Sequence, residues 1–171
     1  MTVGSPSNRG PPPPWRTIAI GGTFDVIHKG HRTLLGKAFE SARKVLIGVP
    51  SDGFVKTLGK SPRRSYAERV DALRRFLAET FPRREYVIQP LNDFFGPLFF
   101  TGEVQALVVS DETAGRVDLA NRLRAERGLD PVDVIVVPRV LADDGKPIST
   151  TRIRRGEIDV EGHLIPSEPG T

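Results

Sequence analysis

The fold is decided by residues 18–31, which read Ile-Ala-Ile-Gly-Gly-Thr-Phe-Asp-Val-Ile-His-Lys-Gly-His. The β-rich residues 16–20 predict one buried strand, and Gly21 and Gly22 at its end let a ligand approach the backbone closely. From Lys29 onward apolar residues recur at helical spacing, so a helix should begin beside the two histidines. Unpaired backbone N–H groups and the positive end of the helix dipole make this position a natural phosphate site.

Two histidines, His28 and His31, stand three residues apart at this predicted helix start. Side chains at positions i and i+3 lie on the same side of a helical turn, so both imidazoles can face one ligand, and Gly30 leaves the approach open. The alternative is an ordinary capped helix start with two solvent-exposed histidines. The fixed order of strand, glycines, hydroxyl, carboxylate and histidines favours the ligand site.

Composition limits the class of protein. With 171 residues and 38% hydrophobic content, the chain is long enough for one domain with a hydrophobic core. The absence of cysteine excludes a disulfide framework, a thiolate nucleophile and a cysteine metal site. No apolar run has membrane-spanning length and no signal peptide is visible, so we expect a cytoplasmic protein that binds no membrane. The net charge of +4 suits an anionic ligand, while the scattering of basic residues among acidic ones argues against nucleic acid as a partner.

Strand and helix patterns alternate along the rest of the chain. Further strands are expected at residues 45–49, 86–89, 105–109 and 132–137. Further helices are expected at residues 66–80 and from the segment 110–113 to about residue 127. This alternation predicts an α/β fold with a five-stranded, mostly parallel sheet. The expected organisation is a disordered proline-rich arm (residues 1–14), a folded domain (15–159) and a tail (160–171).

Two connecting segments carry residues suited to ligand binding. Residues 50–65 leave the carboxyl end of the second strand and are polar and basic, so we expect a flexible loop whose Lys56 or Lys60 covers a phosphate. Residues 90–102 contain Phe94, Phe95, Phe99 and Phe100. These rings either wall a pocket for an apolar substrate arm or pack in the core, and core packing is the commoner role of phenylalanine.

A second cluster of hydroxyl groups follows the fifth predicted strand. Residues 148–156 read Ile-Ser-Thr-Thr-Arg-Ile-Arg-Arg-Gly, and the turn-forming residues 143–147 precede them. Three hydroxyls at the start of a short helix can direct hydroxyl and backbone donors at one phosphate. An ordinary helix cap with a charged surface turn is the alternative. Two phosphate sites without a nucleophile triad or a covalent lysine suit displacement at a nucleotide α-phosphorus, with pyrophosphate leaving.

Three stretches together resemble a known family. Residues 21–31 carry the H-x-G-H signature of the nucleotidyltransferase superfamily in its G-G-T-F-D-x-x-H-x-G-H form, and residues 148–153 carry that superfamily's Ile-Ser-Ser/Thr motif. With residues 108–113 and 141–159, the chain looks most like the archaeal-type phosphopantetheine adenylyltransferases. The resemblance implies a Rossmann-like three-layer fold. It further implies transfer of adenylyl from ATP to 4′-phosphopantetheine, giving dephospho-CoA and pyrophosphate in coenzyme A biosynthesis.

The same resemblance implies roles for individual residues. Catalytic roles fall to His31, His28 and the loop lysine Lys56, with Lys60 as an equally suitable alternative. The residues expected to bind nucleotide or substrate are Gly22, Thr23, Phe24, Asp25, Gly30, Lys60, Ser110, Asp111, Glu112, Thr113, Arg116, Ile148, Ser149, Thr150, Thr151 and Arg152. Mg²⁺ is expected on the phosphates of ATP, with no dedicated protein metal site.

Several alternatives remain open at this stage. The same signature serves cytidylyltransferases and the adenylyltransferases of FMN or nicotinate mononucleotide. A non-catalytic nucleotide- or nucleic-acid-binding module is a further alternative from another class. The chain also departs from the bacterial pattern, because His28 stands where bacterial enzymes usually carry threonine, and their phosphate-gripping arginines have no matching positions here.

Overall fold

The structure, a computed structural model, describes residues 13–169. The predicted proline-rich arm, apart from its last two residues, lies outside the described residues. The strands are β1 (Trp15–Gly21), β2 (Ala42–Pro50), β3 (Glu85–Leu91), β4 (Ala106–Ser110) and β5 (Asp133–Val137). The helices are α1 (Lys29–Ser41), α2 (Asp52–Thr57), α3 (Tyr66–Thr80), α4 (Val117–Glu126) and α5 (Thr150–Arg154), with 3-10 turns η1 (Pro97–Phe100) and η2 (Ala114–Arg116).

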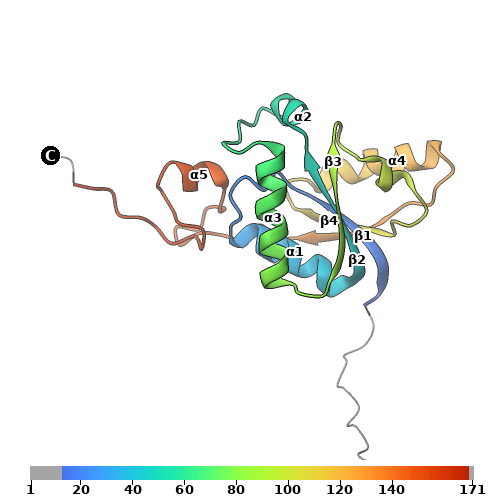
Figure 1. The fold of residues 1–171 in the computed structure, drawn as a ribbon, viewed down its shortest axis with the longest axis horizontal. Helices are drawn as coiled ribbons and strands as arrows, with labels where there is room; N and C mark the ends of the chain where they lie inside the picture. Colours follow the sequence, from blue (N-terminus) through green and yellow to red (C-terminus); the bar gives the residue numbers. More distant parts are fainter. Residues whose placement is uncertain (1–12, 170–171) are drawn as a thin grey trace, which may run out of the picture.

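All five strands are parallel and form one sheet in the order β3-β2-β1-β4-β5 (Figure 1). This confirms the predicted α/β fold and its five-stranded sheet. The strand order changes direction at β1, which pairs with β2 on one side and with β4 on the other. Ligands of open α/β sheets bind at such a switch point, beyond the carboxyl ends of the strands.

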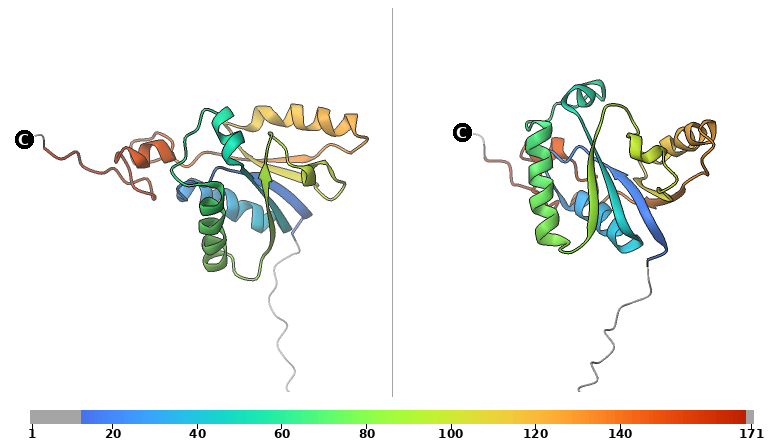
Figure 2. Two further views of the ribbon diagram at one scale, coloured as in Figure 1. Left: turned by 45° about the horizontal axis from the view of Figure 1, so that its top comes forward. Right: turned by 45° about the vertical axis from the view of Figure 1, so that its right-hand side comes forward.

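Helices cover both faces of the sheet (Figures 1 and 2). Ile18 and Ile20 of β1 pack with α1 and α3 on one face, whereas Ala19 packs with α4 and η1 on the other. This alternation follows from the period of two in a strand and explains why β1 is apolar throughout. The result is the three-layer arrangement that the sequence predicts.

The segment 50–65 differs from the flexible loop predicted for it, because it contains the short helix α2. The Ser51 hydroxyl caps this helix by accepting from the N–H of Phe54, and Val55 is buried at 2% exposure. One apolar residue in a polar segment is too weak a periodic signal to predict a helix. Burial in the folded chain, together with the cap, stabilises α2.

The aromatic segment after β3 serves both of the roles that the sequence left open. Phe99 is 3% exposed and belongs to the core between the sheet and α4, and the Phe95 ring stacks on it with centroids 5.0 Å apart. Phe94 is 46% exposed and lies edge-on to Phe54 of α2. The segment thus anchors itself with one ring and presents another at the surface.

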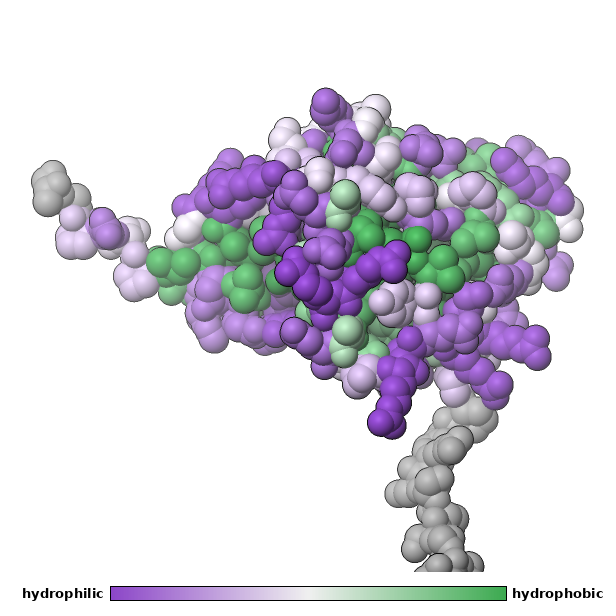
Figure 3. Space-filling view, viewed as in Figure 1, coloured by the Kyte–Doolittle hydropathy of each residue, from purple (hydrophilic) through white to green (hydrophobic). Residues whose placement is uncertain are grey.

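Hydrophilic residues predominate on the face of the molecule drawn in Figure 3. On the face drawn in Figure 3, apolar residues show in a band across the middle and where the C-terminal segment begins. Within residues 13–169, no helix combines the length and the apolar character that crossing a membrane requires.

Candidate functional site

The first half of the site is the start of α1, where the two histidines cap the helix reciprocally. His28 is the N-cap residue, and its Nδ1 accepts from the N–H of Gly30 at 3.1 Å. His31 Nδ1 accepts from the N–H of His28 at 3.3 Å, and the two rings stack with centroids 3.9 Å apart. Because both Nδ1 atoms accept, the proton of each neutral ring resides on Nε2, and the Val26 backbone is a hydrogen-bond partner of the His31 ring.

Both imidazoles are neutral at physiological pH. Burial lowers the pKa of His28 to about 4, with a further contribution from Arg32. Burial also lowers the pKa of His31 to about 3, with contributions from His28 and Lys60. Two neutral rings therefore line the cleft without the solvation cost of two buried charges.

Two glycines make this arrangement possible. A Cβ on Gly30 would lie 2.9 Å from Cε1 of His28, and one on Gly22 would lie 2.8 Å from the Phe24 ring. Phe24 itself is 1% exposed, adopts φ 53°, and packs its ring 5.0 Å from that of His31. Phe24 supports His31 from the core instead of lining the site, at the cost of a left-handed backbone conformation.

The second half of the site is the start of α5. The Ser149 hydroxyl caps this helix by accepting from the N–H of Arg152 at 3.2 Å. The Arg152 side chain turns toward Asp144 and Glu157 and pairs with both. Arg154 instead donates to the Ser61 carbonyl at 2.8 Å, which joins α5 to the loop before α3.

Both halves line one cleft of about 610 Å³ at the carboxyl edge of the sheet. The cleft brings together most of the residues predicted from sequence, namely Gly22, Thr23, Asp25, His28, Gly30, His31, Lys60, Ser110, Glu112, Thr113, Ile148, Ser149, Thr150 and Thr151. The imidazole pair and the hydroxyl trio, more than a hundred residues apart in sequence, thus face a common space.

Four predicted residues do not line this cleft or the cavity beside it: Phe24, Lys56, Asp111 and Arg152. Lys56 is exposed on α2, whereas Lys60 lines both spaces and places its Nζ 3.4 Å from the Thr23 hydroxyl. Asp111 pairs with Arg139 at 3.0 Å. Of the two loop lysines, Lys60 is the one placed to meet a phosphate.

A smaller, mainly apolar cavity of about 180 Å³ adjoins the cleft. Leu91, Phe94 and Phe99 contribute to its walls, and Gln89 supplies a polar group. Arg116 lines it as well, with its guanidinium 4.6 Å from the centre of the Phe94 ring. Thr23, Lys60 and Thr113 line both spaces and mark the junction between them.

Three arginines matter to the site and were not singled out in the sequence. Arg139 and Arg154 line the cleft, and Arg69 is buried beneath the loop that carries Lys60. Arg154 follows the hydroxyl cluster by one helical turn, a spacing that could have indicated a shared face. Arg69 lies on the apolar face of α3, where periodicity predicts only hydrophobic residues.

The C-terminal segment also contributes to the site. The N–H of Lys29, at the first position of α1, donates to the Val160 carbonyl at 2.9 Å, and Arg32 pairs with Glu161. The Gly162 carbonyl accepts from the N–H of Asp143 at 2.9 Å. Residues after α5 therefore connect it to the histidine helix. The predicted domain boundary at residue 159 stays a prediction.

The carboxylates of the site are already engaged. Asp25 is 4% exposed, and its two oxygens accept from the N–H groups of Arg63 and Arg64. Within residues 13–169, no three His, Cys, Asp or Glu side chains come together as a possible metal site.

Comparisons with known proteins find a matching family and similar folds. The sequence model of the cytidylyltransferase-like family matches residues 19–156. A phosphopantetheine adenylyltransferase of Methanopyrus kandleri is 42% identical over 145 residues, which are 85% of this chain and 92% of that protein. One from Methanothermobacter thermautotrophicus is also 42% identical, over 86% of this chain and 88% of its own length.

Among solved structures, a protein of unknown function from Archaeoglobus fulgidus superposes with a TM-score of 0.63. It is 27% identical and covers 71% of this chain and 88% of its own. A bifunctional NMN adenylyltransferase/ADP ribose pyrophosphatase from Francisella tularensis superposes with a TM-score of 0.58 at 19% identity, over 82% of this chain and 41% of its own. The latter likeness shows the fold alone.

Proposed function

The chain belongs to the cytidylyltransferase-like family of nucleotidyltransferases, and we propose that it transfers the adenylyl group of ATP to 4′-phosphopantetheine. The products are dephospho-CoA and pyrophosphate, in coenzyme A biosynthesis. One structural observation carries this function: the His28–His31 pair and the Ser149–Thr151 trio face one cleft, beside an apolar cavity. A polyphosphate and an apolar acceptor arm can meet at the junction of those two spaces.

The reaction needs no protein nucleophile. An oxygen of the acceptor phosphate attacks the α-phosphorus of ATP, the bond from that phosphorus to the β-phosphate bridging oxygen breaks, and pyrophosphate leaves with the electron pair. A phosphate monoester is largely dianionic at neutral pH, because its second pKa is about 6. The attacking oxygen therefore requires no general base, and catalysis depends on orientation and on charge stabilisation.

Different residues around the cleft orient the phosphates and stabilise the developing charge. The Nε2–H groups of His28 and His31 donate to the α-phosphate region, where negative charge develops in the transition state. The hydroxyls and backbone N–H groups of residues 149–151 hold the β- and γ-phosphates. Lys60, at the junction of the two spaces, neutralises the acceptor phosphate and the α-phosphate as they approach one another.

The apolar cavity suits the pantetheine arm. Its walls offer Leu91, Phe94 and Phe99 for the methyl and methylene groups, and the Gln89 amide can pair with an amide of the arm. Because Thr23, Lys60 and Thr113 line both spaces, an arm lying in this cavity would place its phosphate end at the cleft.

Mg²⁺ fits this site only through the nucleotide. Within residues 13–169 there is no carboxylate cluster to hold it, and both oxygens of Asp25 already accept backbone N–H groups. The ion binds one or two carboxylates plus substrate phosphates in many enzymes, and here the phosphates of ATP would be its ligands. It would supply neutralisation of the triphosphate charge. We further propose that the protein acts in the cytoplasm on small molecules, without nucleic acid or membrane partners.

The test is a matrix of nucleotides and acceptors. Purified protein is incubated with ATP or CTP and with 4′-phosphopantetheine, glycerol 3-phosphate, phosphocholine, FMN or nicotinate mononucleotide, and pyrophosphate release is measured. We expect turnover with ATP and 4′-phosphopantetheine and the appearance of dephospho-CoA. Turnover with CTP alone, or with a different acceptor alone, would contradict the proposed substrates. Nucleotide binding without any turnover would favour a binding module.

A further inference from the structure

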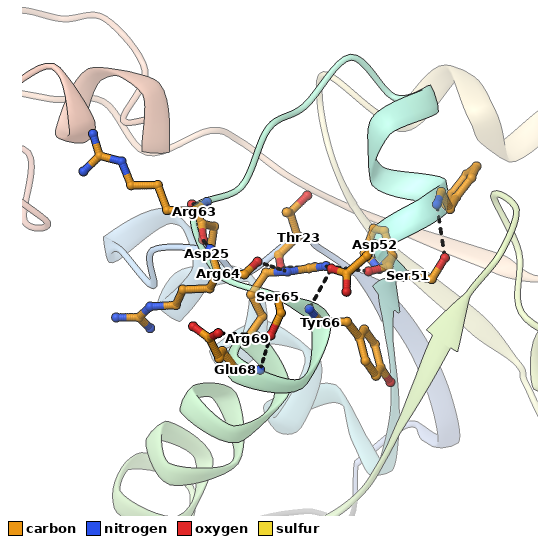
Figure 4. A network of polar contacts seen from close by, with 12 residues as sticks. Thr23, Asp25, Ser51, Asp52, Arg63, Arg64, Ser65, Tyr66, Glu68 and Arg69 are labelled. Carbon is orange, nitrogen blue, oxygen red and sulfur yellow. Dashed lines mark hydrogen bonds and ion pairs between the residues drawn. The ribbon is translucent and has the colours of Figure 1, made fainter.

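A fully buried arginine lies beneath the cleft without lining it itself. Arg69 of α3 is 0% exposed. Its guanidinium donates to the carbonyls of Thr23 at 3.0 Å and Arg64 at 3.3 Å, two residues that Figure 4 draws beside it. It also donates to the Pro50 carbonyl at 2.9 Å. Its carboxylate partner is Asp52 at 3.4 Å, whose side chain is 59% exposed.

Burying an arginine at a packing position costs free energy. A leucine at such a position contributes hydrophobic burial, whereas a buried guanidinium must first lose its hydration. What Arg69 adds is five donors in a rigid plane, and three segments use them. Thr23 follows β1, Pro50 ends β2, and Arg64 belongs to the loop between α2 and α3. Arg69 therefore joins the ends of two central strands to that loop.

The same loop is held from a second direction. The Asp25 carboxylate accepts from the N–H of Arg63 at 3.1 Å and from the N–H of Arg64 at 3.0 Å. The Arg64 peptide groups are thus fixed on both sides, the N–H by Asp25 and the carbonyl by Arg69. Lys60 lies in the same loop, four residues before Arg64, and its Nζ is 3.4 Å from the hydroxyl of Thr23.

We propose that Arg69 is a positioning residue, which together with Asp25 fixes the loop 60–65 against Thr23 and thereby directs Lys60 into the cleft. Arg69 meets no substrate, and its effect passes through Lys60. The inference rests on the proposed adenylyl transfer, because that reaction gives Lys60 its role. Misplacing a catalytic group by about 1 Å from a distant position can cost about a hundredfold in rate.

The experiment is a double-mutant cycle between Arg69 and Lys60 in the full chain. The variants Arg69→Lys, Lys60→Ala and the double variant are assayed for kcat and KM at saturating ATP and 4′-phosphopantetheine, well below the Tm of each. We expect Arg69→Lys to lower kcat by about tenfold to a hundredfold. In the Lys60→Ala background the same change should lower kcat by less than about twofold, because no lysine remains to be positioned.

Arg124 of α4 offers a matched control. It is 2% exposed and donates to the carbonyls of Val104 and Asp130, which precede β4 and β5, and to those of Phe99 and Thr101. Because Phe99 also lines the apolar cavity, any effect of this variant on the acceptor arm should appear in KM and not in kcat at saturation. Arg124→Lys should lower Tm to a similar extent and leave kcat within about twofold of the wild type. Multiplicative losses from Arg69→Lys and Lys60→Ala would overturn the proposal, as would an unchanged kcat in Arg69→Lys.

A second variant covers the case in which Arg69→Lys does not fold. Asp52→Asn keeps the shape of the carboxylate that pairs with Arg69 and accepts from the N–H of Tyr66, but it removes the negative charge. It therefore weakens the same anchor at a residue that lines neither the cleft nor the cavity. This variant should also lower kcat in an otherwise wild-type chain. In the Lys60→Ala background it should lower kcat by less than about twofold further, and losses that multiply would overturn the proposal. A wild-type protein without adenylyl transfer would contradict the proposed function instead, so the two failures are distinguishable.

Discussion

The two halves of the cleft, the histidine start of α1 and the hydroxyl start of α5, are built in different ways. At α1, the hydrogen bonds that orient the rings span two or three residues of sequence. At α5, the cap is local, but Arg154 joins the helix to Ser61, which lies 93 residues away. The rings of the α1 half are thus oriented by their own sequence, even though Lys29 and Arg32 tie the helix to Val160 and Glu161, whereas the α5 half is placed by the fold around it.

The two halves also differ in burial and charge. His28 is buried and His31 is half-buried, and the two neutral rings are in van der Waals contact with each other. Ser149 and Thr150 are half-buried, Thr151 is exposed, and arginines flank them. A preorganised buried donor acts most strongly on charge that develops during the reaction, and an exposed hydroxyl contributes mainly to ground-state binding. We therefore expect changes at α1 to reduce kcat and changes at α5 to raise KM.

His31→Ala should have the largest effect. Loss of one oriented donor to the transition state costs about a hundredfold to a thousandfold in kcat. Steady-state kinetics with ATP and 4′-phosphopantetheine measures this, and circular dichroism checks that the fold is retained. His163→Ala is the control, since His163 is exposed and pairs with Asp159. Near-normal kcat in His31→Ala would remove the proposed difference between the two halves.

Only the α1 half should make stability depend on pH between 4 and 6.5. The folded-state pKa values of His28 and His31, about 4 and about 3, lie below the unfolded value of 6.5. As pH falls below 6.5 the unfolded chain takes up protons that the folded chain resists, so the free energy of unfolding decreases, by roughly 2 kcal/mol per histidine at pH 5. Urea unfolding at pH 7 and pH 5 measures the decrease.

The matched comparison is the double variant His28→Asn with His31→Asn. In this variant most of the decrease in the free energy of unfolding between pH 7 and pH 5 should disappear. Asp144 and Asp159 do not account for the same window. Hydrogen bonds to Arg152 and to the N–H of His163, respectively, hold their carboxyl pKa values below the usual 3.8, so their stabilisation is lost only at lower pH. An equal decrease in the double variant would contradict the assignment.

Lys60→Ala should lower kcat by about tenfold to a hundredfold, because in the proposed reaction the lysine at the junction neutralises both phosphates. Lys56→Ala should stay within about twofold of the wild type, because Lys56 is exposed on α2 and lines neither space. Kinetics of the two variants side by side decides between the lysines that the sequence left equivalent. A larger loss in Lys56→Ala would mean that α2 moves over the cleft when substrates bind.

Thr150→Val should have the smallest effect. The valine keeps the shape and removes one hydroxyl from the α5 half, which should raise KM for ATP by about fivefold to tenfold with little change in kcat. Thr80→Val, at the exposed end of α3, is the control. A fall in kcat with unchanged KM would place Thr150 in the transition state and make the two halves alike.

Much of the site could be predicted because its signals are short in sequence. The strand, the glycines and the histidine spacing all lie within residues 18–31, and the hydroxyl cluster lies within residues 148–151. Helix α2 could not be predicted, since one buried valine gives no periodicity, and the role of Arg69 could not, since its three carbonyl partners lie in different segments.

By itself the sequence determined the α/β alternation, the placement of His28 and His31 at a helix start, and the family. Each of these depends on residues within a few positions of one another, where backbone geometry leaves few choices. Only the tertiary structure decided that the two helix starts share one cleft, that Lys60 and not Lys56 reaches it, and that Arg69 holds the loop. Those outcomes depend on which strands pair, and the parallel order β3-β2-β1-β4-β5 brings together residues that the chain keeps far apart.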